Sequence, residues 1–405
     1  MNRDTPLRRP PLAEAVRRRP WFHGRRPALG LIALASVVLA LPGVWAVGSS
    51  PAAAAPPWTV VMQELDNPRG LAFGDDGALY VAEAGRGGSG PCISLRGLPP
   101  MCAGRTGAVT RLYQGVQHRV VTDLPSYAPE GGEGATGPHD VSVRDRAIWV
   151  TLGLGGDPTL APTAIRAALD ADLGWLIRAQ SDGTWEPIAD LAGYEEAANP
   201  DGGLPDSNPY GLRAGVSSRL VTDAGGNTLL RVSDQGEMAT LAVLPSRAHG
   251  RPTDAVPTAV ALGPDGAYYV GELTGAPFAV GAARVYRVVP GKAPEVFLEG
   301  FTAIIDLTFG PDCHLYVLQH ATEAGLSGPG ALLRIAPDGT RTTLASEGLI
   351  KPTSVVIAPF DAEESASEEV PDAGEGRLTF YISNCGTCVG SGGVTGSGEV
   401  IRLQP

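Results

Sequence analysis

Short runs of apolar residues alternate with glycine-rich turns along most of this chain. In the clearest copy, an apolar run at 70–73 precedes an Asp76-Gly77 turn and an alternating run at 79–82. A third run at 108–113 and a fourth at 119–124 follow, separated by a Gln-Gly turn. Because glycine supplies the positive φ that tight hairpins need, each copy predicts four antiparallel strands.

This unit recurs six times along the chain. The spacings between equivalent apolar positions are 70, 71, 48, 47 and 48 residues, for Leu71, Val141, Leu212, Val260, Leu307 and Val355. A small four-stranded sheet cannot bury both of its faces alone, so the copies must stack on one another. A fixed period of this length predicts a β-propeller or a solenoid.

The ends of the repeat array predict a closed ring. The last copy has only three runs, at 353–357, 377–383 and 399–403, while an unassigned strand at 59–65 precedes the first copy. We expect this N-terminal strand to complete the last blade, because closure removes an exposed sheet edge. An open solenoid is the alternative. The predicted fold is an all-β, six-bladed propeller with blades near 66–124, 137–191, 208–244, 256–300, 304–348, and 351–405 plus 59–65.

Composition agrees with a turn-rich β protein and limits its partners. The 405 residues include 54 Gly and 36 Pro, and the formal net charge is −12. Residues 1–55 hold eight Arg against two acids, so the remaining body carries −18. This excess of acid disfavours nucleic acid and anionic membrane surfaces, which need stripes of Lys and Arg.

The N-terminus predicts export. Residues 1–55 combine a basic stretch, an apolar run at 28–47 and small residues up to Ala55, as in a cleaved signal peptide. The apolar run is also long enough to remain as a membrane anchor. In either case the β-body at 56–405 is expected outside the cytoplasm, secreted or anchored through the uncleaved segment.

Five cysteines fit an oxidising compartment. Cys92 and Cys102 bracket one loop, and Cys385 and Cys388 lie in the equivalent loop of the last blade. Two disulfides are the expected arrangement. The alternatives are a zinc site that joins all four cysteines, or a redox role for Cys385-Gly-Thr-Cys388. Cys313 replaces a turn glycine and is expected to be a free thiol.

The repeat assigns the long loops to one face of the ring. Loops between second and third strands share a face with the connections between blades, and nearly all length variation falls there: 84–106, 152–174, 273–282, 320–330, 385–398, 125–136, 192–207 and 245–255. Binding residues concentrate on long loops of a rigid scaffold, so this is the expected functional face. The acidic insert at 361–376, on the opposite face, is expected to be a solvated excursion.

Polar residues at strand ends on this face are the candidate site. Those at the start of inner strands are Arg69, His139, Asp140, Asn208, Tyr210 and Asp306. At the ends of second strands are Glu83, Asp223, Glu272 and Asn384, whose oxygens suit Ca²⁺ or another divalent cation. Paired carboxylates there would also suit acid–base chemistry. The alternative is structural: polar residues in a wet channel need no ligand.

Several loop motifs resemble a known group of proteins. They are Asn67-Pro-Arg-Gly-Leu-Ala-Phe73, Thr136-Gly-Pro-His-Asp-Val141, Asp206-Ser-Asn-Pro-Tyr-Gly211, Val270-Gly-Glu-Leu-Thr-Gly275 and Ser383-Asn-Cys-Gly-Thr-Cys388. Over residues 57–405 the chain resembles the ScyD/ScyE family, which is related to NHL-type propellers. The resemblance implies an exported six-bladed β-propeller and implies no particular activity.

Two functions therefore compete. The first is a monomeric binding or scaffold module for a protein, a peptide or a cell-envelope glycan. The second is a metal-assisted, lactonase-like hydrolase with carboxylates at the channel mouth. Oxidation with a bound quinone cofactor is a third alternative, for which no specific motif is present. Fold alone does not decide among them, because many activities share this architecture.

Overall fold

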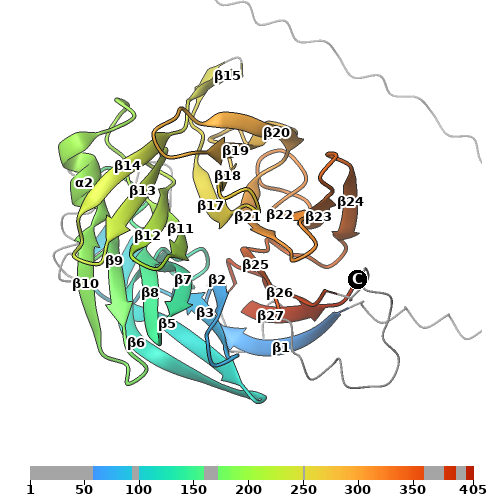
Figure 1. Ribbon diagram of the computed structural model, residues 1–405. Helices are drawn as coiled ribbons and strands as arrows, with labels where there is room; N and C mark the ends of the chain where they lie inside the picture. The colour runs from blue at the N-terminus through green and yellow to red at the C-terminus, as the bar shows by residue number, and fades with distance from the viewer. Residues whose placement is uncertain (1–57, 94–99, 159–171, 250, 360–377, 389–397) are drawn as a thin grey trace, which may run out of the picture. The chain divides into compact units, whose positions relative to one another are not determined.

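Six antiparallel sheets surround a central channel in the computed structural model of the protein (Figure 1). The structure describes residues 58–93, 100–158, 172–249, 251–359, 378–388 and 398–405. These residues belong to one compact unit, Ala55–Pro405. The predicted fold class, a closed six-bladed β-propeller, is confirmed.

Blades 1 to 3 follow one another along the chain. Blade 1 holds β2 (Pro68–Phe73), β3 (Leu79–Glu83), β5 (Met101–Tyr113) and β6 (Val116–Pro129), with the short β4 (Cys92–Ile93) against β5. Blade 2 holds β7 (Pro138–Arg144), β8 (Ala147–Leu152), β9 (Trp175–Ala179) and β10 (Trp185–Asp190). Blade 3 holds β11 (Pro209–Ala214), β12 (Ser218–Asp223), β13 (Thr228–Ser233) and β14 (Met238–Val243).

Blades 4 to 6 complete the ring. Blade 4 holds β17 (Pro257–Leu262), β18 (Tyr268–Glu272), β19 (Ala283–Val288) and β20 (Glu295–Phe301). Blade 5 holds β21 (Ile304–Phe309), β22 (Leu315–Gln319), β23 (Ala331–Ile335) and β24 (Arg341–Ala345). Blade 6 holds β25 (Ser354–Ile357), β26 (Phe380–Asn384), β27 (Gly398–Leu403) and β1 (Trp58–Leu65).

The N-terminal strand closes the ring, as the repeat predicted. β1 pairs antiparallel with β27, with Trp58 opposite Leu403 and Val60 opposite Ile401. Met62 and Leu65 of β1 are buried in the core shared by blades 6 and 1. The outer edge of β27 is therefore covered by a strand from the other end of the propeller chain (Figure 1).

The hydrophobic core lies between blades. Each neighbouring pair shares one apolar cluster, because alternate side chains of each strand face alternate neighbours. Between blades 1 and 2, for example, Val109 and Val121 pack in the same cluster as Val150 and Ile177. Stacking of this kind buries both faces of each sheet, which no blade achieves alone.

Three segments expected to be loops contain regular structure. Residues Met101–Gly104 extend β5 and pair with Ser126–Pro129 at the end of β6. Helix α2 (Leu191–Ala198) lies between blades 2 and 3, with Asp190 as its N-cap. A hairpin of β15 (Arg247–His249) and β16 (Arg251–Thr253) lies between blades 3 and 4. The β5 extension depends on pairing with the far end of β6, which local propensity does not register. Helix α2, of eight residues, and the β15–β16 hairpin, of three residues in each strand, are local elements that are too short for a periodic pattern to show them.

Both predicted disulfides are present. Cys92 is bonded to Cys102, and Cys385 to Cys388. Cys313 is a free, exposed thiol. Because all four sulfurs are in disulfides, no zinc site joins these cysteines in this structure.

Two sequence features lie outside the described residues. They are the N-terminal export segment, including the apolar run at 28–47, and the acidic insert at 361–376. Within the residues that are described, no helix is both long and apolar enough to cross a membrane.

Candidate functional site

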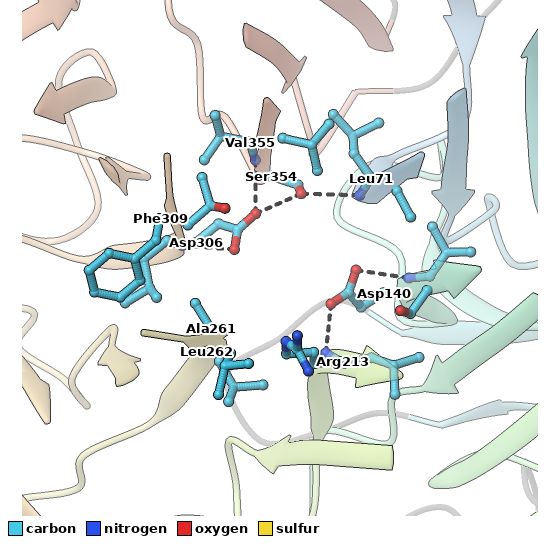
Figure 2. A pocket seen from close by; sticks show the side chains of 17 residues that line it. Leu71, Asp140, Arg213, Ala261, Leu262, Asp306, Phe309, Ser354 and Val355 are labelled. Atoms are coloured by element: carbon cyan, nitrogen blue, oxygen red, sulfur yellow. Dashed lines mark hydrogen bonds between the residues drawn. The ribbon is translucent and has the colours of Figure 1, made fainter. Parts of the chain in front are cut away.

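A cavity of about 330 Å³ occupies the centre of the ring. All six inner strands contribute to its lining (Figure 2), through residues that include Leu71, Asp140, Arg213, Ala261, Asp306 and Ser354. The cavity thus combines an apolar wall with two acids and one base. Because these residues come from every blade, the site depends on closure of the whole ring.

Asp140 joins blade 2 to blade 3 at this cavity. One carboxylate oxygen accepts the N–H of Val141 at 2.8 Å, and the other accepts the N–H of Leu212 on β11 at 2.6 Å. Gly70 on the preceding inner strand makes room for this side chain, since a Cβ there would lie 1.7 Å from Asp140 Oδ1. The glycine at position 70 is therefore explained by the space that the Asp140 side chain needs.

Asp306 does the same on the opposite side of the channel (Figure 2). It accepts the N–H of Leu307 at 2.8 Å, the N–H of Val355 at 2.8 Å and the hydroxyl of Ser354 at 2.7 Å. Ser354 Oγ in turn accepts the N–H of Leu71 at 3.1 Å. This chain of bonds ties blade 5 to blade 6 and blade 6 to blade 1.

Both carboxyl groups hold their protons more tightly than usual. Burial raises the pKa of Asp306 from 3.8 to about 6. Burial, and then the negative charge of Asp306, raise the pKa of Asp140 well above 3.8. Main-chain N–H donors oppose the shift in each case. The channel therefore holds two carboxyl groups, Asp140 and Asp306, that do not both ionise readily.

We expect a measurable pH effect on stability from Asp306. Its folded pKa lies above the unfolded value, so its stabilising contribution is present below about pH 4 and is lost as the pH rises through about 6. Relative to Asp306→Asn, the wild-type free energy of unfolding should fall by up to about 3 kcal/mol between pH 4 and 8. Urea unfolding across this range measures it, and parallel curves for the two proteins would refute it.

A second group of side chains lies at the start of the inner strands. Arg69, His139 and Tyr210 occupy the same repeat position, two residues before Leu71, Val141 and Leu212. β-Bulges interrupt the pairing at these points in β2, β7 and β11, and such bulges re-aim side chains at barrel rims. We call Arg69, His139, Tyr210 and the additional His320 the rim cluster.

The two histidines of the rim cluster are neutral and tied to neighbouring blades. The Nδ1–H of His139 donates to the Pro209 carbonyl at 3.0 Å, and that of His320 donates to the Pro352 carbonyl at 3.0 Å. Burial, and next the Arg69 charge, lower the pKa of His139 to about 3. Burial lowers the pKa of His320 to about 4, and the Arg69 charge adds to the shift.

Tyr210 packs within this cluster. Its ring lies 4.8 Å from that of His139, centroid to centroid, at an angle of 41°. Burial raises the pKa of its hydroxyl, and the nearby Arg69 charge opposes the rise. The charges of Asp140 and Asp306 raise it further, so Tyr210 lies between Arg69 and the two channel acids.

Arg69 is the unusual member of the rim cluster. Its side chain is only 8% exposed, and its Nη2 donates to the carbonyl of Ala135 at 2.9 Å. Its Nε has no acceptor. Within the described part of the chain, no carboxylate forms an ion pair with Arg69. Buried guanidinium groups are normally paired with an anion.

Residues at the ends of second strands have a different role. Their side-chain oxygens accept N–H groups from the segment that leads into the inner strand of the same blade. The four bonds are Asp66 to Glu83 at 2.7 Å, Asn208 to Asp223 at 2.7 Å, Thr302 to Gln319 at 2.7 Å and Ile350 to Asn384 at 2.8 Å. These residues fasten the blade at its channel end, which is a structural task.

Each of the four proposed metal ligands is engaged by a partner within the protein. Glu83, Asp223, Glu272 and Asn384 lie in four different blades, and Glu272 is paired with Arg247 of β15. Burial raises the pKa of Glu272 to about 8. Over the described ranges, no group of three or more His, Cys, Asp or Glu side chains is placed to hold a metal ion.

The remaining candidates are divided between these groups. Asn208 lies just before β11, and its N–H is bound by Asp223 as described, while its side-chain oxygen has no partner. Of the residues that sequence reasoning named, Asp140 and Asp306 line the central cavity, while Arg69, His139 and Tyr210 lie near one another at the start of the inner strands. Sequence reasoning missed His320, which directly follows the second-strand end at Gln319 and was one place outside the repeat position considered.

Comparison with known proteins finds similar arrangements at low identity. No family model matches the chain, and no curated protein is similar to it. Solved structures with a similar arrangement include virginiamycin B lyase from Staphylococcus aureus, at 15% identity, a TM-score of 0.45, and coverage of 81% of this chain and 83% of that one. A gluconolactonase from Xanthomonas campestris matches at 10% identity and a TM-score of 0.47, covering 86% and 89%.

A third match is the quinone-bound aldose sugar dehydrogenase from Streptomyces coelicolor. Its identity is 10% and its TM-score 0.49, over 85% of this chain and 96% of that one. The structures that the chain resembles are six-bladed β-propeller proteins. At these values nothing is carried over from these proteins to this chain, and the six-bladed β-propeller rests on the chain's own sheet topology.

Proposed function

We propose that this protein is an exported β-propeller of the ScyD/ScyE type that binds a carboxylate-bearing ligand at the channel mouth, beside the rim cluster. The motif resemblance and the predicted export segment support the location and the type. The unpaired Arg69 supports the ligand class and is the observation that carries the proposal.

The surroundings of Arg69 favour an anion. In the described residues its guanidinium has only neutral partners, the carbonyl of Ala135 and the hydroxyl of Tyr210, and Nε is left free. His139 and His320 stay neutral next to it, so neither supplies negative charge. A ligand carboxylate would complete the guanidinium with charge-assisted bonds, which are about twice as strong as neutral ones.

Binding is better supported than catalysis at this mouth. Both oxygens of Asp140 and both of Asp306 are occupied by donors of the protein. The Nδ1 of His139 is also committed, to Pro209. The metal-assisted hydrolase needs free oxygens on Glu83, Asp223, Glu272 and Asn384, and each of these side chains is engaged by a partner within the protein. A binding site needs none of these groups to be free.

A thermal-shift panel tests this proposal. The panel contains short peptides with a free carboxy terminus and the same peptides as amides, and galacturonate beside galactose. We expect at least one carboxylate, and not its neutral counterpart, to raise the melting temperature by several degrees at saturation. Arg69→Met should weaken that ligand about 10- to 100-fold, the loss of a hydrogen bond to a charged group.

The matched control is Arg334→Met on β23. Its side chain is 44% exposed, so the substitution removes the same charge from the surface of the protein. This variant should bind like the wild type. The proposal fails if no carboxylate in the panel shifts the melting temperature, or if Arg69→Met binds the ligand as tightly as Arg334→Met does.

A further inference from the structure

Acidic side chains gather where α2, the loop after it and the β12–β13 turn meet. Glu195 lies on α2, Asp201 and Asp206 follow it, and Asp223 ends β12. In the residues that the structure describes, none of these four carboxylates forms an ion pair. We call them the α2 acidic cluster. This cluster is separate from the rim cluster and has no part in the function proposed above.

Glu195 is buried, as is Asp223. Glu195 is 2% exposed, and its Oε1 has no hydrogen-bond partner. Its Oε2 lies against the β12–β13 turn, because a Cβ on Gly226 would be 2.6 Å from that oxygen. A buried carboxylate with an unpartnered oxygen is costly unless a positive charge or a proton accompanies it.

Asp206 reaches the same turn from the other side. A Cβ on Gly225 would lie 2.8 Å from Asp206 Oδ1, and a Cβ on Gly226 would lie 3.5 Å from the Asp206 carbonyl oxygen. Two consecutive glycines therefore bring oxygens of Asp206 next to the Glu195 carboxylate. No hydrogen bond or ion pair occupies the Asp206 carboxylate in the described structure.

Asp223 and Asp201 add negative charge to the cluster, but their carboxylate oxygens already accept hydrogen bonds. Asp223 accepts three main-chain N–H groups and the hydroxyl of Ser207. Asp201 accepts the N–H of Gly203 at 2.7 Å and the side-chain amide of Asn227 at 2.9 Å. The cluster thus offers two available carboxylates inside a negative field, in agreement with the absence of any three-ligand group among the described residues.

Electrostatics shows how unfavourable this arrangement is without a cation. Burial first, and then the charges of Asp223, Asp201 and Asp206, raise the pKa of Glu195 to about 7. Burial and the neighbouring acids raise the pKa of Asp206 to about 6. The largest influences on both groups are burial and other acids. A hard cation with oxygen ligands would remove the repulsion.

We propose that Glu195 and Asp206 bind a calcium ion, with the main-chain carbonyl oxygen of Asp206 and water completing its coordination. Calcium suits the site because it accepts carboxylate, carbonyl and water oxygens in flexible geometry. Two available carboxylates point to an affinity of the kind found in extracellular modules, roughly 10⁻⁴ to 10⁻³ M. Bound there, the ion links α2 and its following loop to blade 3.

Calcium titration of chelator-treated protein at pH 8 tests this. We expect the melting temperature to rise with millimolar Ca²⁺, and calorimetry to give one site in the stated range. Glu195→Gln should abolish the rise and should also raise the melting temperature in chelator, because it removes one charge from the cluster. Asp206→Asn should weaken binding at least 10-fold.

Glu196→Gln is the matched control. It removes the same charge from the neighbouring, exposed position of α2 and should leave the response to Ca²⁺ unchanged. The rival outcome is that a proton alone neutralises Glu195. In that case the melting temperature in chelator rises as the pH falls from 8 to 6 and Ca²⁺ adds nothing at pH 8, which overturns the proposal. Equal loss of response in Glu196→Gln also overturns it.

Discussion

Replacing residues 58–65 with eight glycines and serines should cost more than about 5 kcal/mol and leave little cooperative unfolding. The change removes β1, which pairs along β27. It also removes Met62 and Leu65, each 1% exposed, from the core between blades 6 and 1. The uncovered edge of β27 would then be free to pair with other chains, so we also expect aggregation.

Circular dichroism melts and size-exclusion chromatography measure this result. The control is Val60→Ser, because Val60 is 48% exposed and lies on the same strand. That variant should melt within a few degrees of the wild type. A cooperative, monomeric melt of the replaced protein near the wild-type temperature would show that β1 is dispensable and that blade 6 is stable with three strands.

Glu83→Ala should destabilise the protein by roughly 3 kcal/mol. The Glu83 carboxylate is 0% exposed and accepts bonds from the Arg119 guanidinium, the Thr110 hydroxyl and the Asp66 N–H. Truncation leaves these donors without their acceptor. The loss would loosen three strands of blade 1 and the segment that leads into its inner strand at once.

Urea unfolding of four proteins isolates this effect. Glu299→Ala is the control, because Glu299 is 70% exposed and its contact with Arg284 is 3.5 Å, so the expected loss is about 0–1 kcal/mol. The variant Glu83→Gln should lose less stability than Glu83→Ala, since an amide oxygen can still accept the Asp66 N–H. A loss equal to that of Glu299→Ala would contradict the structural role of Glu83.

These two experiments bear on function as well. If Glu83 is a structural acceptor, its removal changes stability and leaves the response to added metal unchanged. The same reasoning applies to Asp223 and Asn384, which bind main-chain N–H groups in their own blades. Function at the channel mouth then depends on side chains that still have an unpartnered hydrogen-bonding atom, and Arg69 is the clearest of these.

The fold was predictable because each repeat contains the sequence signals for its own strands and turns. Each copy carries its own turn residues and its own alternation, so six copies and a surplus strand at 59–65 sufficed to predict a closed ring. The disulfides followed from loop position for the same reason. The extension of β5 was not predicted because it depends on pairing with the far end of β6, and helix α2 was not predicted because it is only eight residues long.

The sequence by itself thus determined the blade count, the closing strand and the face on which long loops gather. Only the tertiary structure decided which polar residues share a site. Equivalent repeat positions received unequal roles: Arg69 is left without a counter-charge, His139 bonds to the Pro209 carbonyl, and Tyr210 packs against the His139 ring. The physical reason is that hydrogen-bond partners and burial come from neighbouring blades, about 50 to 70 residues away in sequence, and no local pattern encodes them.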